Sequence, residues 1–442
     1  MAVSKKKKSD SFDSFARITS SNIKKGSSHF KSAKRLTQIA RRVSNRANYL
    51  MRKDLFTGRT PSQSKIDKVL KRGVICSEDI ALYQKLPAAV SQRTIQIVGD
   101  NWSAFAAAKK DWKKNPDKYL GMPKPPKYSN HAKTVYIPCS SFAIKNDTVV
   151  FAKKLGLTPL KLKKGMFKDQ PKNPKADESK AVLEIRLVPT GSGFKFEIVY
   201  DKLNSKWDGN LSNNAQSALF DKQSFISIDL GVSRFATLVS NKADISPILI
   251  NGGELKRINQ WYNKRCAILR SKKKYKHIAS VANKRNRKVA DKLHKISRYI
   301  VNLCVMNDIG TVIVGKNAGW KQEVNIGRVN NQNFTNLPHR KFIDILKYKL
   351  REFGIQLKTQ DESYSSKASY VDNDEIPTYK KDNARKYVFS GKRVKRGLYK
   401  TAKGYLVNAD VNGASCIARK AGYNGVSLVT EGCVNQPILI GL

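Results

Sequence analysis

The sequence contains no uninterrupted apolar run of about 18 residues, the length a transmembrane helix requires. Its first ten residues, MAVSKKKKSD, are basic, but no apolar segment follows them as it would in a secretory signal peptide. We therefore expect no membrane anchor and a location in the cytoplasm.

Cysteine and histidine are also scarce. The six cysteines are scattered and never form a CxxC pair, which argues against a zinc ribbon and a disulfide framework. The five histidines form no cluster, so a histidine-based metal site or a His/Cys nucleophile is disfavoured. His294 is expected to pack or to contact phosphate. Free thiols fit a reducing compartment.

Acidic residues are outnumbered. The chain has 34 Asp and Glu against 85 Lys and Arg, which gives a formal net charge of +51. Such an excess calls for a polyanionic partner, with nucleic acid as the first choice and an acidic membrane surface as the second. The 40% hydrophobic content, with 17 Tyr, 17 Phe and 5 Trp, excludes disorder by composition. At ~100–200 residues per domain we expect two to four domains.

The residue patterns change along the chain. Residues 31–112 have apolar residues at helical spacing, with a second helix expected after Pro87. Residues 113–220 contain short β-like runs, two of them joined by PTGSG, which predicts a hairpin within a small barrel or sandwich. Trp102 is expected to lie in the core.

Residues 221–425 have the pattern of one α/β domain. The predicted order is three strands, one or two long helices over 256–306, the strand TVIVG, a helix ending near Gly354, the strand IQLKTQ, a polar insertion and a final helix.

Two carboxylates stand at ends of these elements. Asp229 ends a hydrophobic strand in SIDLG, and Asp410 begins the final helix in NADVNGA. Taken singly, Asp229 is also typical of a turn and Asp410 of a helix N-cap. Together, in this order of strands and helices, they are similar to the first and last carboxylates of an RNase H-like nuclease. Two divalent ions held by carboxylates there would support phosphodiester hydrolysis.

An ordered series of motifs carries a resemblance to a known family. SIDLGVSRFATLVS, RNRKVADKLHKIS, IVGKNAGWK, YKLREFGI, DESYSSKAS and NADVNGASCIARK resemble the TnpB (OrfB) family of transposon-encoded, RNA-guided nucleases, which are relatives of type V CRISPR effectors. The segment LPAAVSQRTIQIV resembles the recognition helices of that family.

The resemblance implies a bilobed α/β protein with additional all-β and helical parts. It divides the chain into a basic arm with the first wedge strand (1–30), a helical recognition region (31–112), a wedge β-barrel (113–220), the first part of a RuvC-like, RNase H-like nuclease domain (221–360), an insertion that binds target nucleic acid (361–407), the final nuclease helix (408–425) and a tail (426–442).

It also implies partners and cofactors. We expect a structured, transposon-derived guide RNA, a double-stranded DNA target with a short flanking motif, no membrane, and a monomer or a homodimer on RNA. The expected cofactor is Mg²⁺ or Mn²⁺, as two ions, in a prokaryotic, nucleoid-associated protein.

The sequence departs from the family at the second carboxylate. Gly315 stands where the family usually has Glu at the end of a strand. We predict that Glu362, after the next strand, reaches the same metal, since neighbouring strands lie ~4.8 Å apart. The predicted catalytic and metal-binding set is therefore Asp229, Glu362 and Asp410, with Asp361 pointing to the other face and Glu323 a weaker substitute. The alternative for Glu362 is a surface carboxylate.

A second departure concerns the zinc ribbon. Ser369 and Asp372 stand where the family has its first cysteine pair, so we expect no structural zinc. Aromatic packing can hold the insertion instead, and the acidic residues there can neutralise bases or bind a cation. The aromatic residues are Tyr364, Tyr370, Tyr379, Tyr387, Phe389 and Tyr399, and the acids are Asp372, Asp374 and Glu375.

Basic clusters predict the nucleic-acid surface. Residues 256–298 hold 16 Lys and Arg but one acid, whereas a solvated helix usually mixes signs. The insertion combines bases with aromatics, which suits single strands, although a packed hairpin explains it too. The predicted binding residues are Arg42, Gln92, Lys273, Lys284, Arg285, Arg287, Lys288, Lys392, Arg393, Lys395 and Arg396.

Four functions remain open on the sequence. The first is an RNA-guided, Mg²⁺-dependent DNA endonuclease of transposon origin with one RuvC-like site. Because Gly315 leaves the usual site incomplete, the second is a guide-directed DNA-binding protein that does not cleave. A compact type V CRISPR effector and a plain RNA-binding protein are the others, and the last does not explain the carboxylates.

Overall fold

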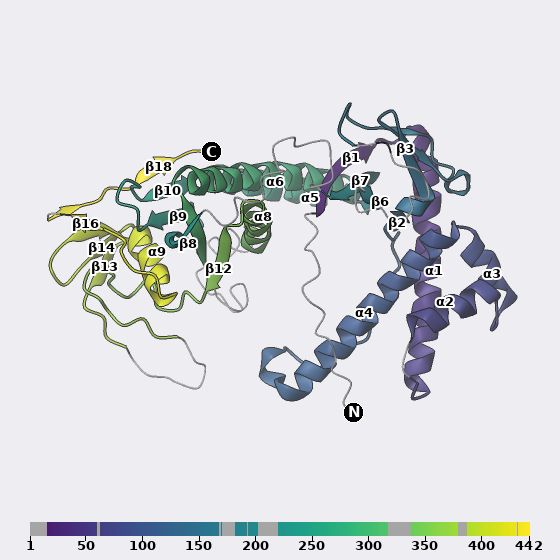
Figure 1. The fold of residues 1–442 in the computed structure, drawn as a ribbon, viewed down its shortest axis with the longest axis horizontal. Helices are drawn as coiled ribbons and strands as arrows, with labels where there is room; N and C mark the ends of the chain where they lie inside the picture. Colours follow the sequence, from purple (N-terminus) through teal and green to yellow (C-terminus); the bar gives the residue numbers. More distant parts are fainter. Residues whose placement is uncertain are drawn as a thin grey trace. The chain divides into compact units, whose positions relative to one another are not determined.

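A computed structural model describes residues 16–59, 62–167, 169, 182–191, 193–201, 220–316, 337–378, 387–430 and 432–442. The chain forms two compact units, Met1–Ser212 and Asn213–Leu442, which are described one at a time. Helices and several small sheets are combined in a mixed α/β fold, as the sequence predicts (Figure 1). No described helix has both the length and the apolar character needed to cross a membrane.

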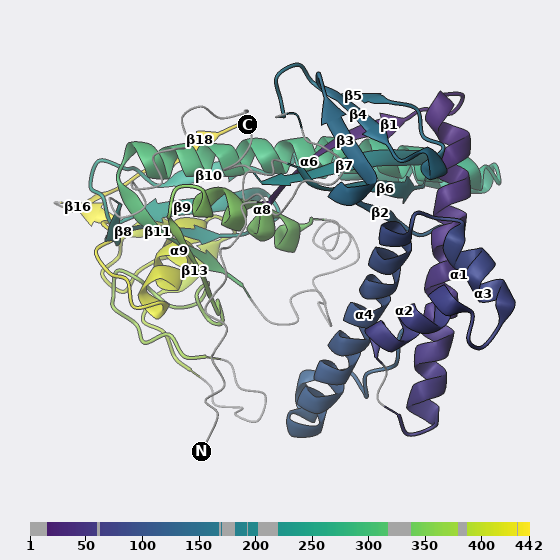
Figure 2. The same cartoon turned by 45° about the vertical axis from the view of Figure 1, so that its right-hand side comes forward.

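The described residues of the first unit form four α-helices. They are α1 (Ser28–Phe56), α2 (Gln63–Arg72), α3 (Ser77–Gln84) and α4 (Ala88–Lys114), and α1 and α4 are the long ones (Figure 2). The helix predicted after Pro87 is α4. Trp102 of α4 is buried and its indole N–H donates to Asn48 Oδ1 of α1 at 2.8 Å, so its predicted core position is confirmed.

Where the first unit is described, its strands form two small sheets. The first has the order β1-β7-β6-β2, and the second has the order β3-β4-β5. Their bounds are β1 Ala16–Ile23, β2 Val135–Pro138, β3 Phe142–Lys145, β4 Thr148–Phe151, β5 Leu160–Lys161, β6 Val182–Thr190 and β7 Gly193–Asp201. The predicted hairpin is confirmed, because Thr190 pairs with Gly193.

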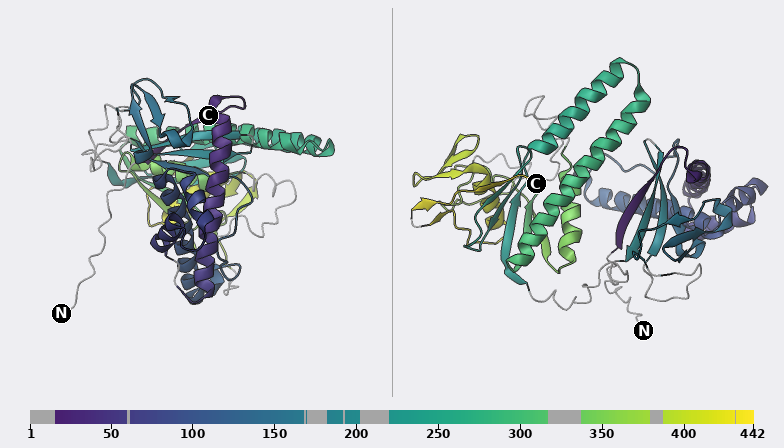
Figure 3. Two further views of the ribbon diagram at one scale, coloured as in Figure 1. Left: turned by 90° about the vertical axis from the view of Figure 1, so that its right-hand side faces the viewer. Right: turned by 90° about the horizontal axis from the view of Figure 1, so that it is seen from above.

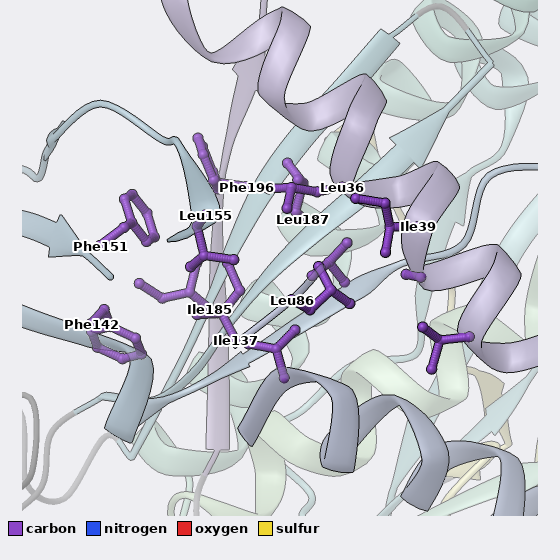
Figure 4. Packing of buried hydrophobic residues seen from close by; sticks show 14 of the residues in the cluster. Leu36, Ile39, Leu86, Ile137, Phe142, Phe151, Leu155, Ile185, Leu187 and Phe196 are labelled. Carbon is purple, nitrogen blue, oxygen red and sulfur yellow. The ribbon is translucent and has the colours of Figure 1, made fainter. Parts of the chain in front are cut away.

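Apolar side chains join these sheets to the helices. Leu36 and Ile39 of α1, Leu86 before α4, and Ile185 and Phe196 of the first sheet belong to one buried cluster (Figure 4). Burying such side chains is the main stabilising contribution to the unit, at ~1.5–3 kcal/mol for each large one. The wedge β-barrel that the sequence predicts would be built from these strands. Their closure into a barrel stays a prediction.

The second unit is built on a six-stranded sheet in the order β12-β11-β8-β9-β10-β18. β8, β9 and β10 pair antiparallel, whereas β8, β11 and β12 run parallel, so their carboxyl ends share one edge. The strands are β8 Asp221–Asp229, β9 Arg234–Ser240, β10 Ile248–Asn251, β11 Ile309–Gly315, β12 Gln356–Gln360 and β18 Ile438–Ile440.

Helices cover both faces of this sheet. α6 (Tyr275–Met306) and α8 (His339–Arg351) pack on one face, and α9 (Ala409–Lys420) packs on the other (Figure 2). α5 (Gly253–Ser271) lies beside α6 as a helical hairpin (Figure 3). The predicted order of strands and helices in residues 221–425 is therefore the observed one.

The insertion between β12 and α9 contains a small antiparallel sheet of β13 (Lys392–Lys395), β14 (Leu398–Lys400) and β15 (Leu406–Asn408). A two-stranded hairpin of β16 (Val429–Thr430) and β17 (Cys433–Val434) follows α9. Part of the expected aromatic packing is present, since the ring of Tyr364 contacts those of Tyr387 and Phe389. Tyr379 lies outside the described residues.

Two aspartates also tie the insertion together. Asp372 accepts hydrogen bonds from Ser369 Oγ at 2.6 Å and from the Ala402 N–H at 2.8 Å. Asp374 accepts from the Ser369 N–H at 2.7 Å and from the backbone and hydroxyl of Ser390. Charge-assisted hydrogen bonds of this kind are about twice as strong as neutral ones. These carboxylates thus connect segments of the insertion around Ser369 and Asp372, the positions that the resemblance to the TnpB family matches to its first cysteine pair.

We predict that Asp374→Ala lowers the free energy of unfolding by ~1–3 kcal/mol, because it leaves the amides of Ser369 and Ser390 without their acceptor. Thermal melts would measure this, with exposed Glu375→Ala as the matched control. A zinc chelator should leave the melting temperature of the parent protein unchanged. A large drop with the chelator, and none with Asp374→Ala, would contradict the account.

Candidate active site

The alternation of side chains along β8 decides where Asp229 points. Ile226 and Ile228 belong to the core on the α6 side of the sheet. Phe225 belongs to the core on the α9 side, and Ser227 Oγ donates to the Ala414 carbonyl of α9 at 2.8 Å. Since successive strand residues face opposite sides, Asp229 shares the α9 face.

The start of α9 brings Asp410 to the same place. Asn408 is the N-cap of α9, because its side chain accepts from the Asp410 and Val411 amides. The alternative that Asp410 is the N-cap is therefore wrong. One turn further on, a Cβ added to Gly413 would lie 3.2 Å from Asp229 Oδ2. The missing side chain thus allows the helix backbone to approach the Asp229 carboxylate.

Asp229 and Asp410 repel each other when both are charged. Burial, followed by the charge of Asp410, raises the pKa of Asp229 to about 7. Arg393 and a hydrogen bond from the Leu230 backbone act in the opposite direction without cancelling the rise. A carboxylate in this position gains from a bound cation more than an exposed one does.

Glu362 occupies the space beside Gly315. Val314 pairs with Ile228, and Gly315, at the end of β11, pairs with Gln360 of β12. A Cβ added to Gly315 would lie 2.8 Å from Glu362 Oε2 and 2.6 Å from Ile417 Cδ1. The carboxylate of Glu362 therefore lies where a side chain at position 315 would begin.

The three predicted carboxylates thus come from element ends at one edge of the sheet. Within the described parts of the chain, no three His, Cys, Asp or Glu side chains stand close enough to hold a metal ion. The charge of Asp410 acts on Asp229, and the Glu362 carboxylate lies beside the backbone of Gly315. Glu323, the weaker substitute, lies outside the described residues.

Arg393 of β13 is predicted to bind nucleic acid, and its guanidinium lies beside the carboxylate of Asp410. Arg393 Nη2 lies 3.4 Å from Asp410 Oδ1, and its Nε donates to the Arg396 carbonyl at 2.9 Å. Lys392, Lys395 and Arg396 are exposed on the same small sheet. The sequence contained a signal for the contact between Arg393 and Asp410. The short strands β14 and β15 follow Arg393 and end directly before α9, which carries Asp410.

The helical hairpin of α5 and α6 carries the other basic cluster. Lys284 and Lys288 lie over the ring of Trp261, at 5.6 and 5.9 Å from its centroid. Arg285 differs from these lysines, since its Nε donates to Asn259 Oδ1 at 2.8 Å and burial lowers its pKa. Arg285 therefore joins α5 to α6, whereas Arg287 is exposed.

The remaining predicted binding residues are surface residues. Lys273 lies in the turn between α5 and α6. Arg42 of α1 and Gln92 of α4 are exposed in the first unit, and Gln92 lines a cavity of about 460 Å³ together with Arg93. His294 lies on α6 as an exposed residue, and its backbone carbonyl accepts from Lys349 Nζ of α8 at 2.7 Å.

The raised pKa of Asp229 leads to a pH-dependent stability. A carboxyl group whose pKa is raised by folding destabilises the folded state as pH rises from ~4 through about 7. We predict that Asp229→Asn stabilises the metal-free protein at pH 8, with an upper limit of ~4 kcal/mol. The gain should shrink toward zero as pH falls to ~4.

Chemical denaturation of both proteins in EDTA at pH 8 and pH 4.5 measures this difference, with Asp221→Asn as a control at the opposite end of β8. Equal stabilisation at both pH values would contradict the electrostatic interpretation.

Two family profiles match parts of the second unit. Residues 212–321 match the family profile OrfB_IS605, described as a probable transposase, and residues 339–417 match the Cas12f1-like TNB domain. A search of curated proteins gives no significant match.

Two solved structures are similar to the chain. "Cryo-EM structure of the Cas12f1-sgRNA-target DNA complex" shares 16% identity, with 90% of this chain and 97% of that chain covered and a TM-score of 0.33. "Cryo-EM structure of CRISPR-Cas12f Ternary Complex" shares 15% identity, with coverages of 86% and 80% and a TM-score of 0.32. The two family profiles, which follow each other along the second unit, support a TnpB-like family related to the type V effectors for this part of the chain.

Proposed function

We propose that the protein is an RNA-guided, Mg²⁺-dependent DNA endonuclease of transposon origin, with one RuvC-like, RNase H-like active site. One observation carries the proposal. The Glu362 carboxylate fills the space of the absent side chain at Gly315, at the sheet edge that also carries Asp229 and faces Asp410.

The strand order supports an RNase H-like domain. Numbered along the chain, the five strands β8 to β12 are arranged 3-2-1-4-5, with the first three antiparallel and the last two parallel to the first. The carboxylates lie at the carboxyl end of the central strand and beside it, which is where open α/β sheets bind their ligands.

The residues at this edge fit a divalent cation by their chemistry. All three candidate ligands are carboxylates, the oxygen donors that Mg²⁺ and Mn²⁺ prefer. Asp229 is crowded by Asp410, and a cation would relieve that repulsion. Bound there, two divalent ions would supply an activated water and stabilise the leaving oxygen.

Arg393 complements the carboxylates. Its side chain is 40% exposed and reaches Asp410 from the insertion. A guanidinium in this position can bind the phosphate oxygens of a nucleic acid strand at the site. Arg393 therefore combines the nucleic-acid role predicted from the sequence with a place beside the carboxylates.

The charge of the chain supports guide RNA and target DNA as partners. A net charge of +51 exceeds what a protein without a polyanion would carry, and the exposed bases on α6 and the insertion sit in the unit that carries the carboxylates. The titles of the two similar structures name an sgRNA, a target DNA and a ternary complex.

A second function follows from Gly315. If the displaced Glu362 does not complete the site, the protein is a guide-directed DNA-binding protein without cleavage. Reconstitution with RNA co-purified from the native locus separates the two functions. Cleavage of a matching target supports the nuclease, and guided binding without cleavage supports the alternative.

We predict that Glu362→Ala lowers the cleavage rate by more than ~100-fold, since even partners of metal ligands typically contribute 10–100-fold. Gly315→Glu alone should also be impaired, because its side chain would collide with Glu362 and Ile417. The double variant Gly315→Glu/Glu362→Ala should regain activity, because the Glu362 carboxylate is then removed and only the Cδ1 end of the Ile417 side chain has to move.

A time course of target cleavage by each ribonucleoprotein gives these rates. Full activity of Glu362→Ala would eliminate the proposed site.

The bases on α6 lead to a separate prediction for RNA binding. Changing Lys284, Arg287 and Lys288 together to Gln should weaken RNA binding and reduce the slope of log K against log salt by ~2–3. Lys295→Gln is the control, because Lys295 already pairs with Asp291 on the same helix at 3.1 Å. An unchanged slope in filter-binding titrations would show that these side chains do not contact phosphate.

A further inference from the structure

We propose that Lys420 is a positioning residue which, through Asp361, holds Glu362 beside Gly315. This inference rests on the proposed function, because it concerns how the displaced carboxylate keeps its place. Glu362 follows the last residue of β12 by two positions, so the sheet itself does not fix its side chain. Some other contact has to hold this segment.

Lys420 is the last residue of α9, and its side chain is only 5% exposed. Its ammonium has three donors, and the structure gives three acceptors. Nζ donates to Asp361 Oδ1 at 2.8 Å, to the Ser363 carbonyl at 3.1 Å and to the Pro377 carbonyl at 2.9 Å. Two of these acceptors are the residues on either side of Glu362.

The segment around Glu362 is closed by further hydrogen bonds. Asp361 Oδ1 also accepts from the Ser363 amide at 3.0 Å and from the Ser363 hydroxyl. The Glu362 carbonyl accepts from the Ser365 amide at 3.1 Å and from Ser365 Oγ at 2.8 Å. The backbone of Glu362 is thereby fixed on both sides, which leaves the side chain few directions.

Helix α9 connects this clamp to the rest of the site. Asp410 lies in its first turn, Ile417 contacts the space beside Gly315, and Lys420 ends it. An α-helix rises 1.5 Å per residue, so the distance between its ends is set rigidly at about 15 Å. One helix therefore sets the positions of Asp410 and of the segment that carries Glu362.

The alternative is that Lys420 only stabilises the fold. Removing one partner of a buried ion pair commonly destabilises a protein by ~3–5 kcal/mol. A positioning role differs from this in one respect, since it predicts a loss of cation affinity in protein that is still folded.

The experiment measures Mn²⁺ binding to the full chain by calorimetry, together with the melting temperature, for the parent, Lys420→Met, Asp361→Asn and Glu362→Ala. Lys358→Met is the control, because Lys358 is a part-buried lysine of β12 that donates to Tyr423 at 2.6 Å, away from Glu362. We expect Lys420→Met and Asp361→Asn to bind Mn²⁺ ~10–100-fold more weakly than Lys358→Met.

Equal Mn²⁺ affinity of Asp361→Asn, Lys420→Met and Lys358→Met would overturn the positioning role. If Lys420→Met does not fold, Asp361→Asn decides on its own. Equal affinity of the parent and Glu362→Ala would instead overturn the proposed metal site, so the two failures are distinguishable.

Discussion

The structure of the second unit depends on one constraint, the alternation of side chains along the central strand β8. Ile226 and Ile228 must enter the core on the α6 side, so Asp229 is placed under α9, where water is limited and Asp410 adds a like charge. This placement costs free energy, and burial together with Asp410 raises the pKa of Asp229 to about 7. A stability cost at such a position is typical of a functional site, where residues that are unfavourable for folding are retained because the chemistry needs them.

In the proposed function, a residue that follows the neighbouring strand supplies the carboxylate that position 315 lacks. β11 and β12 run parallel with Gly315 opposite Gln360, so a residue shortly after β12 can reach the end of β11. Glycine is the residue that leaves room there, because even a Cβ would meet Glu362 and Ile417. In the proposed function, Gly315 and Glu362 therefore act as a pair, in which Glu362 supplies the carboxylate that position 315 does not have.

Much of this arrangement could be predicted from the sequence. The hydrophobic runs that end in Asp229 and Gly315 predict two of the strands, and the order of the motifs predicts the order of the helices. These predictions succeed because strands and helices depend on local residue patterns. The capping role of Asn408 was missed, since Asn and Asp two residues apart are equally good caps and only the hydrogen bonds distinguish them. The direction of Arg393 and the joining role of Arg285 could not be predicted, because basic clusters look alike until tertiary contacts separate the paired members from the exposed ones.

The central claim is that Glu362 belongs to the same cation site as Asp229 and Asp410. Anomalous diffraction from crystals of the protein with Mn²⁺ tests it most directly, because the signal locates the metal without reference to activity. The account predicts a manganese peak whose ligands include an oxygen of Glu362 and an oxygen of Asp229. A peak bound by Asp229 and Asp410 alone, with Glu362 turned away from the metal, would contradict it.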